Sequence, residues 1–440
     1  MKAILILSLA LFARSLPGQV SFNDYQLPPH EYYEGDSRDP VSILVRQIEA
    51  GEKSPDLSSA RAFADWLLKE LRISPTSQTV VFSRTGLQRK VVSPHNPRAL
   101  FFNDQTYMTW IPGGMVELAS YDPDRGPLFF LLQGSEDPKP ATVQFNRRES
   151  CLNGCHAGSA TNYLPGLLAR SLHVDAEGNP TQVDKAGIVV NAISKHENMF
   201  HTMPLEERWG GWFVTGDHGK TSHIGNLIFP VRGGPPVPAP SLAETGTAYP
   251  HGPFSDILPL LVQDHQIGLL NTLYESLYRW RTLLFLANET RATRGETSLS
   301  QLEPADLKTL LPKLDKTVKQ FLFAGEVPLP EGGVNGDPAF IAAFQEHRQI
   351  DSQGRSLRDF DLKTRLLKHR CSHMILSPQF QGMPPAFRSI VYARIREVLS
   401  AKPAIIGFEH LSDEERGVLL EILNETVAGF GGEMLAIMPK

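Results

Sequence analysis

The chain has 440 residues, of which 41 % are hydrophobic and 21 % charged, the balance of a globular protein rather than a disordered one. Its formal net charge is −5 and it contains no basic run, which argues against nucleic-acid binding. After the first residues no stretch reaches about 18 apolar residues in a row, so we expect no transmembrane segment in the mature chain.

The first residues have the pattern of a secretory signal peptide. Lys2 gives a positive start, residues 3–12 are almost wholly apolar, and small residues follow at Ala13 and Ser15. An apolar stretch of this length is too short to span a bilayer. We therefore expect residues 1–18 to be removed and the mature protein to be periplasmic or secreted.

The next part of the chain changes from a helical to a strand-like pattern. Residues 41–72 carry apolar residues at helical spacing. From Gln78 onward, short apolar runs such as residues 98–102 are separated by Pro, Gly, Asn or Asp. These runs predict about five to seven strands of an antiparallel sheet or small barrel.

The stretch CLNGCH, residues 151–156, follows the last predicted strand and is the strongest signal in the chain. Two cysteines close together in the sequence, the second followed directly by histidine, are typical of the attachment site of a c-type haem, C-x-x-C-H. Three residues separate these cysteines, so the stretch is one residue longer than that signature. We expect one covalent haem c, bound through Cys151 and Cys155, with His156 as the proximal iron ligand.

Other sites use the same residue types. A structural zinc ion could take both cysteines and His156, and it would need a fourth ligand such as Cys371. A redox-active dithiol is a further alternative, although no thioredoxin-like pattern lies nearby. Arg147 and Arg148 precede the motif and either pair with haem propionates or form an ordinary solvated charge pair.

Residues 196–231 are a second unusual stretch, rich in histidine, methionine and tryptophan. Haem iron often takes a second protein ligand on its other face, and this stretch offers candidates. His201 is the first candidate for the distal position, with Met203 and His223 as alternatives. An open position that binds substrate is a further possibility, and each side chain also has a plainer role on the surface or in a hydrogen bond.

The remaining chain is predicted to be mainly helical. Residues 232–250 are rich in Pro and Gly and predict a semi-rigid linker. Apolar residues at spacings of three and four over residues 255–288 predict a long helix, whose apolar stripe includes His265. His265 is then either a hydrogen-bonded core residue or part of a haem pocket. Shorter helices are predicted at residues 304–324, 337–349, 385–400 and 412–428.

These patterns predict an α+β fold. We expect a β-rich, haem-bearing N-terminal domain over residues 41–231, followed after the linker by a mostly helical C-terminal domain over residues 251–440.

Several blocks of the sequence resemble one known family. They are FNDQTYMTWIPGG, MVELASYDP, CLNGCHA, PLEERWGGWFVTGDHG, SHIGN, QDHQIGLLN and GRSLRDFDL, and they spread over about residues 40–400. Together they resemble the large, exported single-haem proteins called cytochrome c domain-containing proteins. The resemblance implies a haem and an export route, and it does not imply a particular reaction.

The expected function is that of a periplasmic c-type haem protein, active in electron transfer or as a haem oxidoreductase. Its partner is a redox protein or a small-molecule substrate. The alternative is a haem-based gas or redox sensor, or a binding module without turnover.

Overall fold

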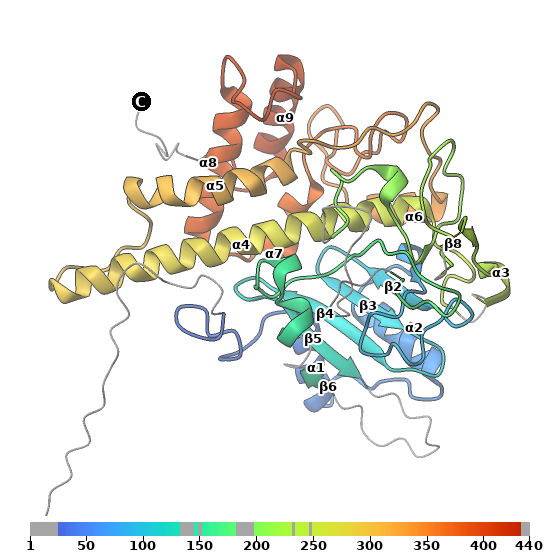
Figure 1. Ribbon diagram of the computed structural model, residues 1–440. Helices are drawn as coiled ribbons and strands as arrows, with labels where there is room; N and C mark the ends of the chain where they lie inside the picture. Colours follow the sequence, from blue (N-terminus) through green and yellow to red (C-terminus); the bar gives the residue numbers. More distant parts are fainter. Residues whose placement is uncertain are drawn as a thin grey trace, which may run out of the picture.

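The computed structural model describes residues 25–132, 145–147, 152–181, 198–230, 234–245 and 249–432. The predicted signal peptide lies outside these residues. Within them, the chain contains both helices and an antiparallel sheet, which confirms the mixed α+β class (Figure 1).

The sheet has seven strands in the order β6-β5-β4-β3-β2-β1-β7, each antiparallel to its neighbours. The strands are β1 Thr79–Val81, β2 Arg98–Phe102, β3 Thr106–Trp110, β4 Val116–Asp122, β5 Gly126–Leu132, β6 Phe145–Arg147 and β7 Trp212–Phe213. Strands β8 Leu227–Ile228 and β9 Val237–Pro238 form a separate pair. Strand β9 therefore lies inside the stretch that was predicted as a linker.

The α-helices are α1 Pro40–Glu49, α2 Ala60–Glu70, α3 Leu242–Thr245, α4 Ile257–Thr293, α5 Pro304–Phe321, α6 Pro338–Gln345, α7 Pro378–Gln381, α8 Pro385–Ser400 and α9 Asp413–Thr426. Helix α9 begins as predicted, because the Ser412 side chain accepts a hydrogen bond from the Glu415 N–H at 3.1 Å.

Alternate side chains of a strand point to opposite faces of its sheet, and the two faces here have different cover. On one face, the Val41 N–H of α1 donates to the hydroxyl of Ser120 at 3.3 Å. On the other face lies α4, whose Gln266 side chain accepts a hydrogen bond from the Tyr107 hydroxyl at 3.0 Å. Figure 1 shows this long helix crossing above the strands.

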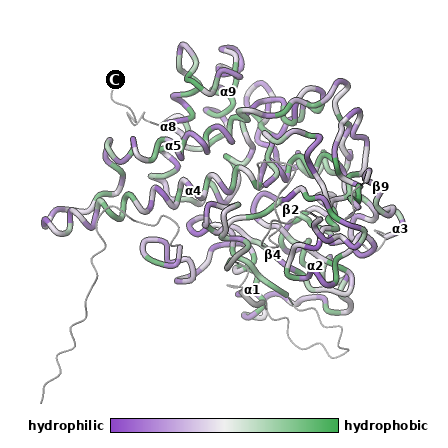
Figure 2. Tube along the Cα trace, in the orientation of Figure 1, coloured by the Kyte–Doolittle hydropathy of each residue, from purple (hydrophilic) through white to green (hydrophobic). Residues whose placement is uncertain are grey.

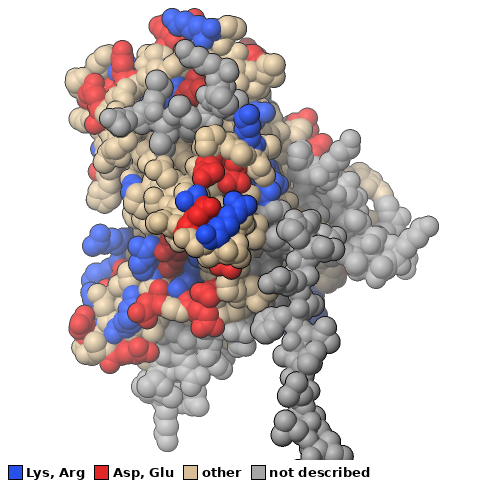
Figure 3. All heavy atoms as spheres, turned by 90° about the vertical axis from the view of Figure 1, so that its left-hand side faces the viewer, with Lys and Arg blue, Asp and Glu red and all other residues tan. Residues whose placement is uncertain are grey.

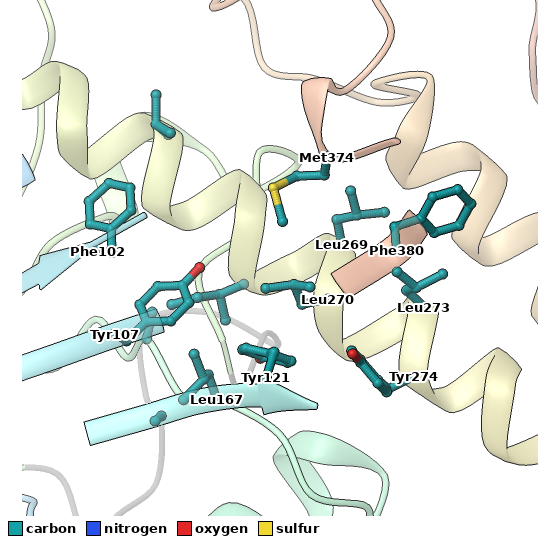
Figure 4. Close-up of a cluster of buried hydrophobic side chains, with 14 of the residues drawn as sticks. Phe102, Tyr107, Tyr121, Leu167, Leu269, Leu270, Leu273, Tyr274, Met374 and Phe380 are labelled. Carbon is teal, nitrogen blue, oxygen red and sulfur yellow. The ribbon is translucent and has the colours of Figure 1, made fainter. Parts of the chain in front are cut away.

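Helix α4 has neighbours on several sides. Its residues are buried from Ile257 to Leu283 with few interruptions, and apolar and polar residues alternate along it (Figure 2). Tyr121 of the sheet packs against Tyr274 of α4 with ring centroids 5.4 Å apart. Figure 4 shows these two side chains next to each other between the sheet and α4, with Leu167 near Tyr121. The helix is therefore stabilised mainly by tertiary packing.

The division into two domains at residues 232–250 stays a prediction. Side chains before and after that stretch pack in one continuous hydrophobic core, as the contacts of α4 with the sheet illustrate. None of the helices in the described ranges is long and apolar enough to cross a membrane. On the face that Figure 3 shows, acidic and basic side chains are mixed around the ends of α4 and α5, as in the Arg291–Glu296 pair at 3.3 Å.

Candidate functional site

Residues Leu152–His156 of the cysteine motif form one wide helical turn of the π type. The Ala157 N–H donates to the Leu152 carbonyl, five residues back, at 3.1 Å. Such a turn holds one residue more than an α-turn and is frequent at functional sites. The motif likewise has one residue more between its cysteines than C-x-x-C-H, and part of that longer spacer lies in this wide turn.

One end of the turn is buried and the other is exposed to solvent. Leu152 is buried in the hydrophobic core, whereas Cys155 is exposed and has a free thiol. Cys151 lies outside the described residues, as do the side chains of Arg147 and Arg148. The roles predicted for these three residues therefore stay predictions.

The imidazole of His156 is held in one orientation. Its Nδ1 lies 2.9 Å from the carbonyl oxygen of Gly166, and its ring packs against Phe129 of β5 with centroids 4.4 Å apart. A carbonyl only accepts hydrogen bonds, so Nδ1 carries the proton in the neutral ring. The other ring nitrogen, Nε2, then has the free lone pair that a metal ion needs.

The surroundings favour this neutral ring. Desolvation lowers the pKa of His156, and the guanidinium groups of Arg170 and Arg98 act in the same direction. The hydrogen bond to Gly166 and the carboxylate of Glu117 oppose that shift. Because a histidine binds a metal through its neutral form, a lowered pKa favours coordination.

Asparagine side chains bind the backbone of the segment that follows the motif. Asn271 of α4 accepts a hydrogen bond from the Leu167 N–H at 3.0 Å and donates to the Leu167 carbonyl at 2.9 Å. Asn198 makes the same pair of bonds elsewhere, to the Ala169 N–H at 2.9 Å and the Ala160 carbonyl at 3.0 Å. The loop is thereby fixed without regular secondary structure of its own.

The segment also contains strained backbone. Asn162 and Tyr163 have φ values of 53° and 58°, in the left-handed region that bulky residues rarely adopt. The Asn162 amide donates to Glu275 of α4 at 2.9 Å, and Lys313 and Lys316 of α5 pair with the same carboxylate. Helix α4 therefore contacts the loop through Asn271 and Glu275, which lie about one turn apart.

His201, the first candidate for the distal ligand, lies in a buried cluster. Its Nδ1 is 3.1 Å from Nδ1 of His265, whose Nε2 is 2.7 Å from the Ser372 hydroxyl. Burial lowers the pKa of His201 to about 3 and also lowers that of His265, so both rings are neutral. Phe323 stacks on His265 with centroids 4.0 Å apart. These contacts agree with the plainer interpretation of His265 as a hydrogen-bonded core residue.

The two alternative distal ligands lie near His201 in sequence but have separate environments. Met203 is 1 % exposed, and its carbonyl accepts a hydrogen bond from Nε of Arg208 at 2.9 Å. His223 packs edge-on against Trp209, and burial lowers its pKa to about 4. The contacts found for His156 in the described part of the chain involve none of the three candidates, so the choice of distal ligand stays a prediction.

The two described cysteines differ sharply. Cys155 is exposed, whereas Cys371 is fully buried and desolvation raises its pKa to about 12. The residues that the structure describes include no group of three or more His, Cys, Asp or Glu that could hold a metal ion. That search does not extend to Cys151, so it leaves the zinc alternative untested.

Sequence analysis did not single out Gly166, Asn271, Asn198 or Phe129. Asn271 ends the block QDHQIGLLN, but its role, like that of the others, depends on a contact made only in the folded chain. No family model, curated protein or solved structure matches this chain, and the site is therefore interpreted from its geometry.

Proposed function

We propose that this chain is an exported c-type haem protein, periplasmic or secreted, that acts in electron transfer or as a haem oxidoreductase. The hydrogen bond between Nδ1 of His156 and the Gly166 carbonyl, 2.9 Å long, carries the proposal. It leaves Nε2 as the metal-binding nitrogen, an arrangement typical of metal-ligating histidines.

The other donors also suit a haem c. Cys155, directly before His156, has a free and exposed thiol, as a thioether bond to a porphyrin vinyl group would require. Cys371 is buried and its pKa is raised to about 12, so it is a poor nucleophile and we assign it a structural role. In this proposal Cys151 forms the second thioether, and the wide turn at Leu152–His156 takes up the additional residue of the spacer.

A bound haem supplies an iron that alternates between Fe(II) and Fe(III). The chain contributes the orientation and basicity of the His156 ring and the apolar packing of Phe129. It is also far longer than the roughly 100 residues of a typical small domain, which favours an additional substrate pocket or docking surface for a redox partner. The family resemblance and the predicted signal peptide support the same proposal.

Substitution of the motif residues tests the proposal. Cys155→Ala should give protein without covalent haem, judged by peroxidase staining of a denaturing gel and by the loss of one porphyrin mass. Cys371→Ala is the matched control and should retain haem. Wild-type haem content in Cys155→Ala, or no porphyrin mass in the wild-type protein, would refute the proposal.

The proximal role of His156 has its own test. His156→Ala should lose the low-spin visible spectrum while keeping some attached haem, whereas His347→Ala, at a histidine whose side chain is 86 % exposed, should leave it unchanged. An unaltered spectrum in His156→Ala would assign the iron to another ligand. Binding of CO to the reduced protein would favour an open or labile distal position, as in a sensor or an enzyme.

A further inference from the structure

We infer that Asn271 of α4 is a positioning residue for His156 and acts through the peptide unit that joins Gly166 to Leu167. This role rests on the proposed function, because His156 is the residue that would bind the iron. The hydrogen bonds themselves are present in the chain without a haem.

One rigid group connects the two side chains. The Gly166–Leu167 peptide is not among the cis bonds, so its C=O and N–H point in opposite directions from one plane. The carbonyl accepts a hydrogen bond from Nδ1 of His156 at 2.9 Å, and the N–H donates to Oδ1 of Asn271 at 3.0 Å. A rotation of this plane would break both bonds together.

Close packing prevents the peptide from moving sideways. A Cβ atom at Gly166 would lie 2.7 Å from Oδ1 of Asn271 and 2.8 Å from Cγ2 of Thr161. Only glycine allows the backbone to approach α4 this closely. The Gly166 N–H also donates to the His156 carbonyl at 2.9 Å, so the two residues are joined by two hydrogen bonds.

The helix fixes the loop a second time. Asn162, four residues before Gly166, donates to Glu275 at 2.9 Å, and Glu275 lies one turn beyond Asn271 on α4. With the loop bound on both sides of Gly166, the carbonyl has one available direction. Helix α4 therefore determines where the His156 ring points.

Hydrogen bonds in a chain polarise one another. The bond from the Leu167 N–H to Asn271 makes the Gly166 carbonyl a stronger acceptor, and a stronger acceptor at Nδ1 makes Nε2 more electron-rich. A more basic histidine ligand stabilises Fe(III) over Fe(II) and so lowers the reduction potential. Asn271 thus lowers the reduction potential of a bound haem iron without contacting it.

The experiment measures the reduction potential of the full-length haem protein in three variants. Asn271→Ala removes the acceptor and should shift the potential to more positive values. Asn271→Asp keeps the acceptor for the Leu167 N–H, loses the donor to the Leu167 carbonyl and adds negative charge, so it should shift the potential in the opposite direction. The added charge lowers the potential in any case, so the positive shift in Asn271→Ala, compared with a control variant, is the decisive result.

Asn198→Ala is the matched control, because Asn198 also makes two backbone hydrogen bonds in this loop but does not touch the Gly166–Leu167 peptide. It should lose comparable stability with no shift in potential. Equal shifts in Asn198→Ala and Asn271→Ala, or no shift in either Asn271 variant, would overturn the inference.

A measurement without haem separates this inference from the proposed function. In Cys155→Ala protein, ¹⁵N NMR of the His156 ring should find the proton on Nδ1, and adding Asn271→Ala should move population to the tautomer with the proton on Nε2. An unchanged tautomer would overturn the inference even in a haem protein. Absence of haem from the wild-type chain would refute the proposed function and leave this test valid.

Discussion

Two histidine environments in this molecule differ in a way that bears on function. His156 lies on a partly exposed turn and donates to a carbonyl, which fixes its tautomer. His201 lies in the core, where its partner is His265 and that ring in turn contacts Ser372. The comparison shows that a carbonyl partner fixes the proton of His156 on Nδ1, whereas a second imidazole as partner leaves the tautomer of His201 open.

The core region should respond most strongly to pH. Desolvation raises the pKa of Asp264 to about 7, against the opposing charge of Arg208. The folded state therefore keeps a proton that the unfolded state releases near pH 4, so the contribution of Asp264 to stability falls as the pH rises from about 4 to about 7. At about 1.4 kcal/mol per pKa unit, the change amounts to several kcal/mol.

The difference in unfolding free energy between wild type and Asp264→Asn, measured by urea denaturation across this pH range, isolates that contribution. Glu326, whose pKa is also raised to about 7, shares Arg208 with Asp264, so the same pair of proteins is also compared with Glu326→Gln in both. A difference that does not change with pH would contradict the shift.

His265→Ala tests whether the buried cluster is structural. It removes a ring with 0 % exposure and leaves Nδ1 of His201 and the Ser372 hydroxyl without their partner, so we expect a loss of about 3 kcal/mol in stability. Denaturant unfolding measures the effect, with the exposed His347→Ala as control. Haem content should stay the same, and its loss would place His265 at the haem site instead.

Gly166→Ala tests the motif segment. The new Cβ would overlap Asn271 and Thr161, and overpacking of this kind costs about 1–3 kcal/mol. The same variant should disturb the hydrogen bond of His156, visible as a change in its ring NMR signals. Wild-type stability together with unchanged ring signals would show that the loop accommodates the added Cβ without disturbing His156.

The smallest effect is expected at the strained pair of residues. Asn162→Ala removes the hydrogen bond to Glu275, at a cost of about 1 kcal/mol, and should weaken the connection of the loop to α4. Asn162→Gly loses the same bond but relieves the positive φ, so it should cost less. Equal losses would assign the whole effect to the hydrogen bond.

Periodicity predicted most of the fold. The apolar run at residues 98–102 forms strand β2, and the helix predicted at residues 385–400 has those bounds. Helix α4 extends beyond its predicted end at residue 288, to Thr293. The prediction stopped too early because the last residues of the helix lie outside the continuous apolar stripe on which it was based. Helix α5 ends at Phe321, shortly before Phe323 adopts a positive φ of 54°.

Of the candidate site, only the cysteine motif was predictable from the sequence. Adjacent Cys155 and His156 can be read from the sequence, because their relation is local. The contact of His156 with Gly166 spans ten positions and that of Leu167 with Asn271 spans 104, and no spacing rule connects them. The position of His201 against His265, 64 residues away, was equally invisible to pattern analysis.

The long separation between Leu167 and Asn271 also affects the order of maturation. In the proposed function, Cys151 and Cys155 are synthesised well before helix α4, which we infer to orient the His156 ring. Thioether formation on the growing chain would therefore occur before the orientation of the His156 ring is fixed. If the proposal holds, a protein truncated before α4 should still acquire covalent haem, but the orientation of its His156 ring should vary.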